Sequence, residues 1–351
     1  MRRVLAVAGA TVAFLVGVAG PAVACGGLIG PNGAVNLLRT TTFAGYHDGV
    51  EHYVTSFAFA GGGGAFGSLT PLPGVPTKVE RGGDWTLQRL IRETTAVAES
   101  ARFAAPTALA SKGDAEVIMK VKVDALDITV LKGGGKAVGE WATEHGFRLP
   151  PDAPEVLDFY ARRSPIFLAA AFDANEAKKR GQNIGDGTPV HITIPTANPW
   201  VPLRILALGK DARERVEADV YLLTDRRPNL LSTTRIGTNA TLSIEYDDAA
   251  SESLLRDLRD DKTGDWVPDS GWLTKVTVSG PAGDLTGDLA IDANGVQEPS
   301  MVAAGFNIAP GSPGFPQPYD ESPAPAIAVA VMAGSLLTAA AVSSFRGRRT
   351  A

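Results

Sequence analysis

The sequence contains a single cysteine, Cys25, among its 351 residues. One cysteine cannot close a disulfide within the chain, so disulfide bonds do not hold this fold together. The common nucleophile and metallohydrolase motifs are also missing, because the chain has no G-x-S-x-G, S-x-x-K or H-E-x-x-H pattern. These absences remove the usual sequence evidence for a serine or zinc hydrolase. Carboxylate pairs stay open, since their spacing is spatial and leaves no sequence motif.

Glycine-rich and acidic stretches are present, but none has the spacing of a cofactor site. The runs AGGGGAFG (60–67) and KGGGK (132–136) lack the G-x-x-x-x-G-K-[ST] and G-x-G-x-x-G patterns of phosphate-binding loops. The acidic turns at 260–265 and 284–295 lack the spaced ligands and final glutamate of an EF-hand loop. We therefore expect no cofactor and interpret these stretches as loops.

Basic residues are in the minority once the two ends of the chain are set aside. The whole chain has 33 Lys and Arg against 38 Asp and Glu. Two of the basic residues precede residue 25 and three follow residue 345, so residues 25–325 carry 28 basic against 38 acidic side chains, a net charge of −10. A surface of this sign repels polyanions. Nucleic acid is therefore not an expected partner, whereas cations and basic partners are favoured.

The N-terminal segment has the order of a secretory signal peptide. Two arginines precede an apolar run (4–19), which leads to the small-residue triplet A-V-A ending at residue 24. Because signal peptidase accepts small residues such as Ala22 and Ala24, we expect cleavage after residue 24, with Cys25 as the mature N-terminus. Two alternatives stay open for Cys25. It could be acylated as in a lipoprotein, although Ala22 replaces the usual leucine, or it could be a catalytic or metal-binding thiol.

The C-terminal segment has the pattern of a membrane anchor. Residues 326–345, AIAVAVMAGSLLTAAAVSSF, carry no charge and are followed by Arg346, Arg348 and Arg349. As a helix rising about 1.5 Å per residue, this segment would span about 30 Å, the thickness of the hydrocarbon core. An apolar segment closed by arginines is typical of a stop-transfer helix with its basic end in the cytoplasm. We predict a transmembrane helix over 326–345 and a cytoplasmic tail over 346–351; the alternative is a buried helix.

The remaining chain divides by composition. Six prolines in residues 307–325 predict an extended stalk next to the membrane. Between the signal peptide (1–24) and this stalk we expect an exported domain over 25–227. We expect residues 228–306 to form a β-rich extension or subdomain, since the pair Arg226-Arg227 and a proline interrupt the pattern there.

Hydrophobic periodicity predicts an α+β fold with a mainly antiparallel sheet and packed helices. Two β-rich runs flank the turn Asp48-Gly49 and predict a hairpin. Several further strands follow one another without an intervening helix, which favours antiparallel pairing. The further strands are expected at 117–130, 190–194, 203–208, 216–223 and 273–278, and helices at 85–97, 136–145, 154–162 and 251–260.

Two of the four histidines flank the predicted hairpin turn. His47 and His52, with Glu51 beside them, are the candidate metal ligands, because imidazole nitrogen and carboxylate oxygen are the usual ligands where paired thiols are lacking. Neighbouring side chains of a strand point to opposite faces, so a polar hairpin tip is the alternative interpretation. His145, at a predicted helix end, and His191, in a predicted strand, both have structural explanations.

Several stretches together resemble the bacterial family catalogued as domain of unknown function 2330 (DUF2330). They are ACGG after the leader, LTPLPGVP (69–76), a helix with Trp141 ahead of H-G-F at 145–147, and VPLRI (201–205). The resemblance covers about 25–227 and departs from the family where Ala142, a small residue, follows the tryptophan. It implies an exported protein, often with a signal peptide and a C-terminal anchor. The family has no assigned reaction or catalytic residues.

The sequence therefore favours a non-enzymatic, single-pass envelope protein whose domain is displayed outside the bacterial cell membrane for binding or assembly. Its expected partner is another envelope or membrane protein. One alternative is a membrane-tethered hydrolase that acts on an envelope substrate through unidentified residues. Another is an accessory subunit of a membrane protein, suggested by Gly334 and Thr338 one helical turn apart.

Overall fold

The computed structural model describes residues 27–31, 33–34, 40–57, 66–95, 117–181, 188–231 and 241–306. The predicted signal peptide with Cys25, the stalk, the transmembrane helix and the C-terminal arginines lie outside these residues. The mixed α+β class with mostly antiparallel strands is confirmed. No helix in the described ranges is long and apolar enough to cross a membrane.

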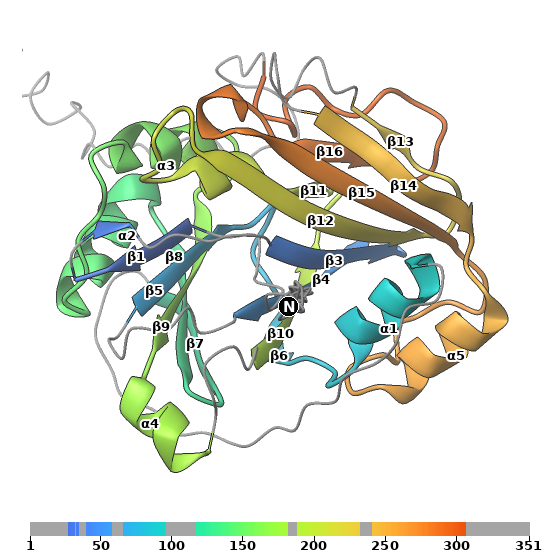
Figure 1. The fold of residues 1–351 in the computed structure, drawn as a ribbon, viewed down its shortest axis with the longest axis horizontal. Coiled ribbons are helices and arrows are strands. Elements are labelled where there is room, and N and C mark those ends of the chain that lie inside the picture. The colour runs from blue at the N-terminus through green and yellow to red at the C-terminus, as the bar shows by residue number, and fades with distance from the viewer. Residues whose placement is uncertain are drawn as a thin grey trace, which may run out of the picture.

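A seven-stranded sheet, here called the large sheet, forms the centre of the molecule (Figure 1). Its strand pairs are antiparallel except for β12 with β3, which is parallel. In spatial order the strands are β14 (Thr241–Ala249), β15 (Trp272–Pro281), β12 (Arg215–Thr224), β3 (Thr40–His47), β4 (Val50–Phe57), β10 (Thr188–Pro195) and β6 (Lys78–Arg81). Residues 228–306 thus supply β14 and β15 to the same sheet as β3 and β4.

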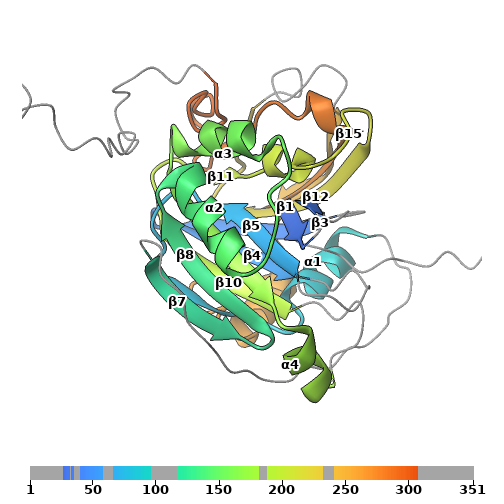
Figure 2. The ribbon, with the colours of Figure 1, turned by 90° about the vertical axis from the view of Figure 1, so that its left-hand side faces the viewer.

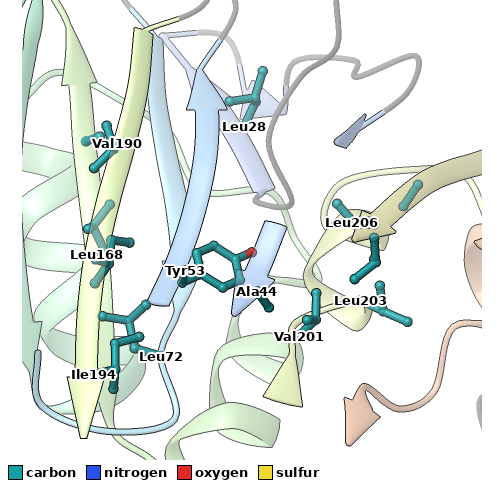
Figure 3. Packing of buried hydrophobic residues seen from close by; sticks show 14 of the residues in the cluster. Leu28, Ala44, Tyr53, Leu72, Leu168, Val190, Ile194, Val201, Leu203 and Leu206 are labelled. Atoms are coloured by element: carbon teal, nitrogen blue, oxygen red, sulfur yellow. The ribbon is translucent and has the colours of Figure 1, made fainter. Parts of the chain in front are cut away.

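An antiparallel six-stranded sheet, the second sheet, packs against the large one. Its strands in spatial order are β2 (Gly33–Ala34), β1 (Gly27–Gly30), β5 (Phe66–Pro71), β9 (Ile166–Phe172), β8 (Leu126–Lys132) and β7 (Val117–Val123). Side chains from the two facing surfaces form one apolar cluster, in which Ala44 and Tyr53 of the large sheet meet Leu28 and Leu168 of the second (Figure 3). Burial of this surface is the main source of cohesion between the sheets.

Helices cover the outer face of each sheet. α2 (Gly134–Glu144) and α3 (Ala153–Ala161) lie on the second sheet (Figure 2), where Trp141 packs with Phe167. α1 (Thr86–Thr94) and α5 (Glu252–Asp260) lie on the large sheet, where Leu90 and Leu258 pack with Phe43 and Val54. α4 (Ala174–Lys179) follows β9. Because each sheet is covered on both faces, side chains of either orientation are buried in its central strands.

A small three-stranded sheet closes one end of the two sheets. Its strands are β11 (Trp200–Val201), β16 (Leu289–Asp292) and β13 (Asn229–Leu230). Beside it lie the 3-10 turns η1 (Arg204–Ala207) and η3 (Ala282–Asp284). The strand predicted over 203–208 is therefore wrong. The backbone N–H groups of Leu203 and Arg204 donate to Asp288, at 2.7 and 2.8 Å, and these bonds turn the chain.

Asp288 is the acceptor in a buried ion pair that holds together the elements at this end of the fold. Both Asp288 and its partner Arg163 are fully buried. The Tyr160 hydroxyl also donates to Asp288 at 3.0 Å, and the Arg163 guanidinium lies 4.1 Å from the ring centroid of Trp200. The pair therefore connects the end of α3 to η1, β11 and β16.

Removing Arg163 should destabilise the fold strongly, because Asp288 would stay buried without its cation. We expect Arg163→Met to lower the free energy of unfolding by about 3–5 kcal/mol, as for other broken buried pairs. Chemical denaturation measures this loss. The control is Arg215→Met, which breaks the exposed pair with Glu217 and should cost at most about 1 kcal/mol. Equal losses in the two variants would contradict a structural role for the buried pair.

Candidate functional site

The β3–β4 hairpin places Glu51 and His52 in the middle of the layered structure. The predicted turn is present, with Asp48 and Gly49 at φ values of 49° and 78°, the left-handed conformation that tight hairpins require. In the antiparallel register Glu51 lies opposite Tyr46 and His52 opposite Gly45. Because successive side chains of a strand point to opposite faces, Glu51 faces the second sheet and His52 faces the helices. Both are buried, at 0% and 8% exposure.

His52 is paired with a second buried histidine, His191 of β10. His52 Nδ1 lies 3.0 Å from His191 Nε2, and their ring centroids are 5.2 Å apart. One neutral ring can donate to the other in this arrangement. On its other side His52 is covered by Trp266, whose ring lies parallel to it at 4.0 Å. We call His52, His191 and Trp266 the histidine cluster.

Burial makes the charged forms of both histidines unfavourable. It is the largest of the causes that lower the pKa of His52 to about 3, and the nearby His191 and His47 contribute in the same direction. Burial likewise lowers the pKa of His191 to about 4, against the opposing effect of Glu80. His191 Nδ1 is buried and has no hydrogen-bond partner among the described residues. Glu80 Oε1 is 3.8 Å from it, beyond hydrogen-bond distance. Both rings are therefore neutral at neutral pH.

Glu51 is a buried carboxyl on the opposite face of the same strand. Neither of its oxygens has a hydrogen bond of normal geometry to a residue that the structure describes. Burial raises its pKa to about 8, although the backbone of Trp200 acts in the opposite direction. Across the hairpin, the Tyr46 hydroxyl donates to the Thr196 carbonyl at 2.9 Å and not to Glu51. Glu51 is therefore protonated at neutral pH.

The structure does not bring the three candidate metal ligands together. His47, at the end of β3, has its Nδ1 2.7 Å from Asp225 Oδ1 near the surface. Glu51 and His52 lie on opposite faces of the large sheet. In the described ranges no group of three or more His, Cys, Asp or Glu side chains is arranged to hold a metal ion. The processing residues Ala22, Ala24 and Cys25, and the arginines 346, 348 and 349, lie outside the described residues.

Sequence reasoning missed the pairing of His52 with His191 and the contact with Trp266. His191 is 139 residues from His52 along the chain, so local spacing carries no signal for the pair. One signal for the tryptophan is Gly45, in a β-rich run. A Cβ at Gly45 would lie 1.9 Å from Trp266 Cη2. An isolated glycine within a strand is typical of such a close approach.

The fold and the site define an α+β domain of two packed sheets, whose β3–β4 hairpin carries buried, uncharged titratable groups. The chain belongs to the bacterial family described as "Uncharacterized protein conserved in bacteria (DUF2330)", whose model matches residues 20–291. The resemblance noted in the sequence is thereby confirmed, and the match extends beyond residue 227 to β16.

No curated protein matches the chain. Similar solved structures include a mutated baculovirus P35 after caspase cleavage, at 9% identity and a TM-score of 0.38, with 74% of this chain and 98% of that chain covered. The crystal structure of baculovirus P35 gives 9% identity and a TM-score of 0.36, with 73% and 96% covered. TM-scores this low carry no argument about this chain.

Replacing Glu51 with glutamine should stabilise the protein at neutral and alkaline pH. The folded-state pKa of Glu51 is raised from 4.5 to about 8, so folding becomes less favourable as pH rises from 4.5 to 8. At pH 7 this effect amounts to up to about 3 kcal/mol, which Glu51→Gln should recover. Urea denaturation of both proteins at pH 4.5, 6, 7 and 8 measures the difference. A difference that does not grow with pH contradicts the assignment.

Proposed function

We propose that this protein is an exported, single-pass envelope protein, anchored by its C-terminus, whose two-sheet domain is a non-enzymatic binding or assembly module. The observation that carries the proposal is the order of segments along the chain. An arginine-led apolar run ends in A-V-A, a folded domain follows, and a proline-rich run leads to an uncharged apolar segment closed by arginines.

The boundaries of the domain support this order. β1 begins at Gly27, two residues after Cys25, and all four of its residues are buried. A Cβ at Gly27 would lie 2.7 Å from Leu208 Cδ2, so the chain is tightly packed from its first described residue. At the other end Phe306 packs against Gly287, directly before the proline-rich segment. The described domain is therefore packed at both ends, as expected for a domain that lies between a leader and an anchor.

Two features favour binding over catalysis. Glu51, His52, His191 and Tyr160, whose pKa values are strongly perturbed, are all buried in the interior, where a substrate cannot reach them. By contrast, Trp85 at the start of α1 is 52% exposed. Exposed tryptophan is enriched in protein interfaces, where it contributes a large share of the binding energy. The net charge of −10 between residues 25 and 325 favours a basic partner surface.

Cell fractionation tests the location. We expect the full chain to stay with the membrane after alkaline carbonate washing, and a chain truncated after residue 325 to be released outside the cytoplasm. The mature N-terminus should be Cys25, as determined by mass spectrometry. Ala24→Leu should block cleavage, because the peptidase requires a small residue there, and the matched control Val23→Leu should not. A soluble cytosolic chain that retains Met1 contradicts the proposal.

The state of Cys25 is resolved by the same samples. With ordinary cleavage, Cys25→Ser leaves processing unchanged and the mature wild-type mass shows no lipid. An acyl mass on Cys25, with processing lost in Cys25→Ser, would instead identify a lipoprotein.

The binding role is tested by affinity purification of the full chain from detergent-solubilised membranes. A stoichiometric partner that Trp85→Ala releases supports a binding module; recovery of the protein alone contradicts it.

A further inference from the structure

Trp266 covers His52, one member of the buried histidine pair, from the outside. Its indole comes from the connection between α5 and β15, residues 261–271, and lies flat on His52 with the ring planes 6° apart. The same indole stacks on Phe43, at 6.0 Å between centroids, and passes over Gly45. Trp266 is itself partly exposed. The indole therefore separates the His52 imidazole from solvent, and His52 in turn lies against His191.

The rest of this connection is held by contacts that do not involve the histidines. On one side of the indole the Asp261 carboxylate accepts a hydrogen bond from the Thr86 hydroxyl at 2.7 Å. On the other side Val267 is buried, and Arg259 donates to the Pro268 carbonyl at 2.6 Å. The indole can therefore rotate away from the sheet while the backbone on either side keeps its attachments.

The charged and titratable groups around the pair come from β3, β6 and the connection. They are His47 of β3 and Lys78 and Glu80 of β6, while the connection itself carries the buried Asp261 and the exposed Lys262 and Asp265. Glu80 favours a charge on His191, but Lys78 forms an ion pair with Glu80 at 2.7 Å and opposes that charge. The effects of Glu80 and Lys78 on the pKa of His191 therefore oppose each other.

We infer that the histidine cluster is an acid-responsive latch, in which protonation of His52 and His191 is coupled to rotation of the Trp266 indole away from the large sheet. Two imidazolium rings present only donors to each other, so their 3.0 Å contact is lost and their charges repel. Rotation of the indole gives both rings water. It also uncovers Phe43 and the backbone at Gly45, an apolar patch that the closed form hides.

The coupling of protonation to rotation sets how strongly the ratio of open to closed molecules depends on pH. In the open form the rings are exposed and have their ordinary pKa of 6.5, whereas in the closed form these values fall to about 4 for His191 and about 3 for His52. Each histidine therefore raises the ratio of open to closed molecules about tenfold per pH unit below 6.5. From pH 6.5 to 4.5 the two together change this ratio roughly two-thousandfold, enough to convert a mostly closed population into a mostly open one.

The test is ¹⁹F NMR of the full-length chain in detergent, labelled with 5-fluorotryptophan. The chain has five tryptophans, and Trp266→Phe identifies the resonance of Trp266. We expect this resonance to move to a solvent-exposed position between pH 6.5 and 4.5. Trp141 and Trp200 belong to the separate cluster beneath α2 and α3, so their resonances should stay fixed and exclude global unfolding.

Three variants separate the latch from other acid effects. His52→Phe combined with His191→Gln keeps a ring under the indole but removes both protonation sites, and its Trp266 resonance should not respond to acid. His47→Gln, a change to the partly exposed histidine of the same hairpin, should keep the acid response, because both rings of the pair remain. Gly45→Ala should show the open position at pH 7.5, because the added methyl occupies the space of the indole.

An unchanged Trp266 resonance at pH 4.5, or movement of Trp141 and Trp200 together with it, overturns the latch. An acid response that survives in the double histidine variant also overturns the latch, since groups other than these two histidines would then be the sensor. A closed position in Gly45→Ala with Trp141 and Trp200 unchanged would show that the indole does not need the space over Gly45, and this also contradicts the latch.

Discussion

This structure depends on one constraint. Successive side chains of a strand point to opposite faces, and the large sheet is covered on both of its faces. In a sheet with one wet face, every second residue of β4 would be in water. Here helices cover the outer face of the large sheet and the second sheet covers the inner one, so Glu51 and His52 are both buried. The chain has no disulfide to supplement its core, and the layered packing therefore provides the cohesion.

Buried polar groups in this fold fall into two kinds. Asp288 has a cation, a tyrosine hydroxyl and two backbone N–H donors, so its charge is compensated and joins four elements. Glu51 and the His52–His191 pair lack such compensation and remain uncharged. Compensated groups fix geometry, whereas uncompensated groups make stability depend on pH. These three titratable groups lie on neighbouring strands, β4 and β10, of one sheet.

The local features of the fold were predictable from the sequence. Alternating β-branched residues and the Asp48-Gly49 turn were enough to predict β3 and β4, because a hairpin depends on neighbouring residues. The error at 203–208 came from a contact that no local pattern contains, since Asp288 lies 85 residues from the Leu203 N–H that it accepts. Hydrophobic residues alone favoured a strand there, and a distant carboxylate turned the backbone into η1.

The candidate site was predictable in part for the same reason. Residue type and position identified His52 and Glu51 on the hairpin, and strand alternation implied that they would face apart. The partners that give these residues their chemistry come from β10 and from the connection after α5, both far away in sequence. The proposed export and anchoring rest on the two ends of the chain, and the pH-dependent chemistry rests on the domain between them.

The central claim is that β4 carries uncharged titratable side chains on both of its faces at neutral pH. The most direct measurement is an NMR titration of protein labelled with ¹³C at the glutamate carboxyl carbons and the histidine rings. At pH 6 the account predicts a protonated carboxyl for Glu51 and a neutral imidazole for His52, with Glu51 ionising near pH 8. An ionised Glu51 together with a charged or half-charged His52 at pH 6 would contradict it.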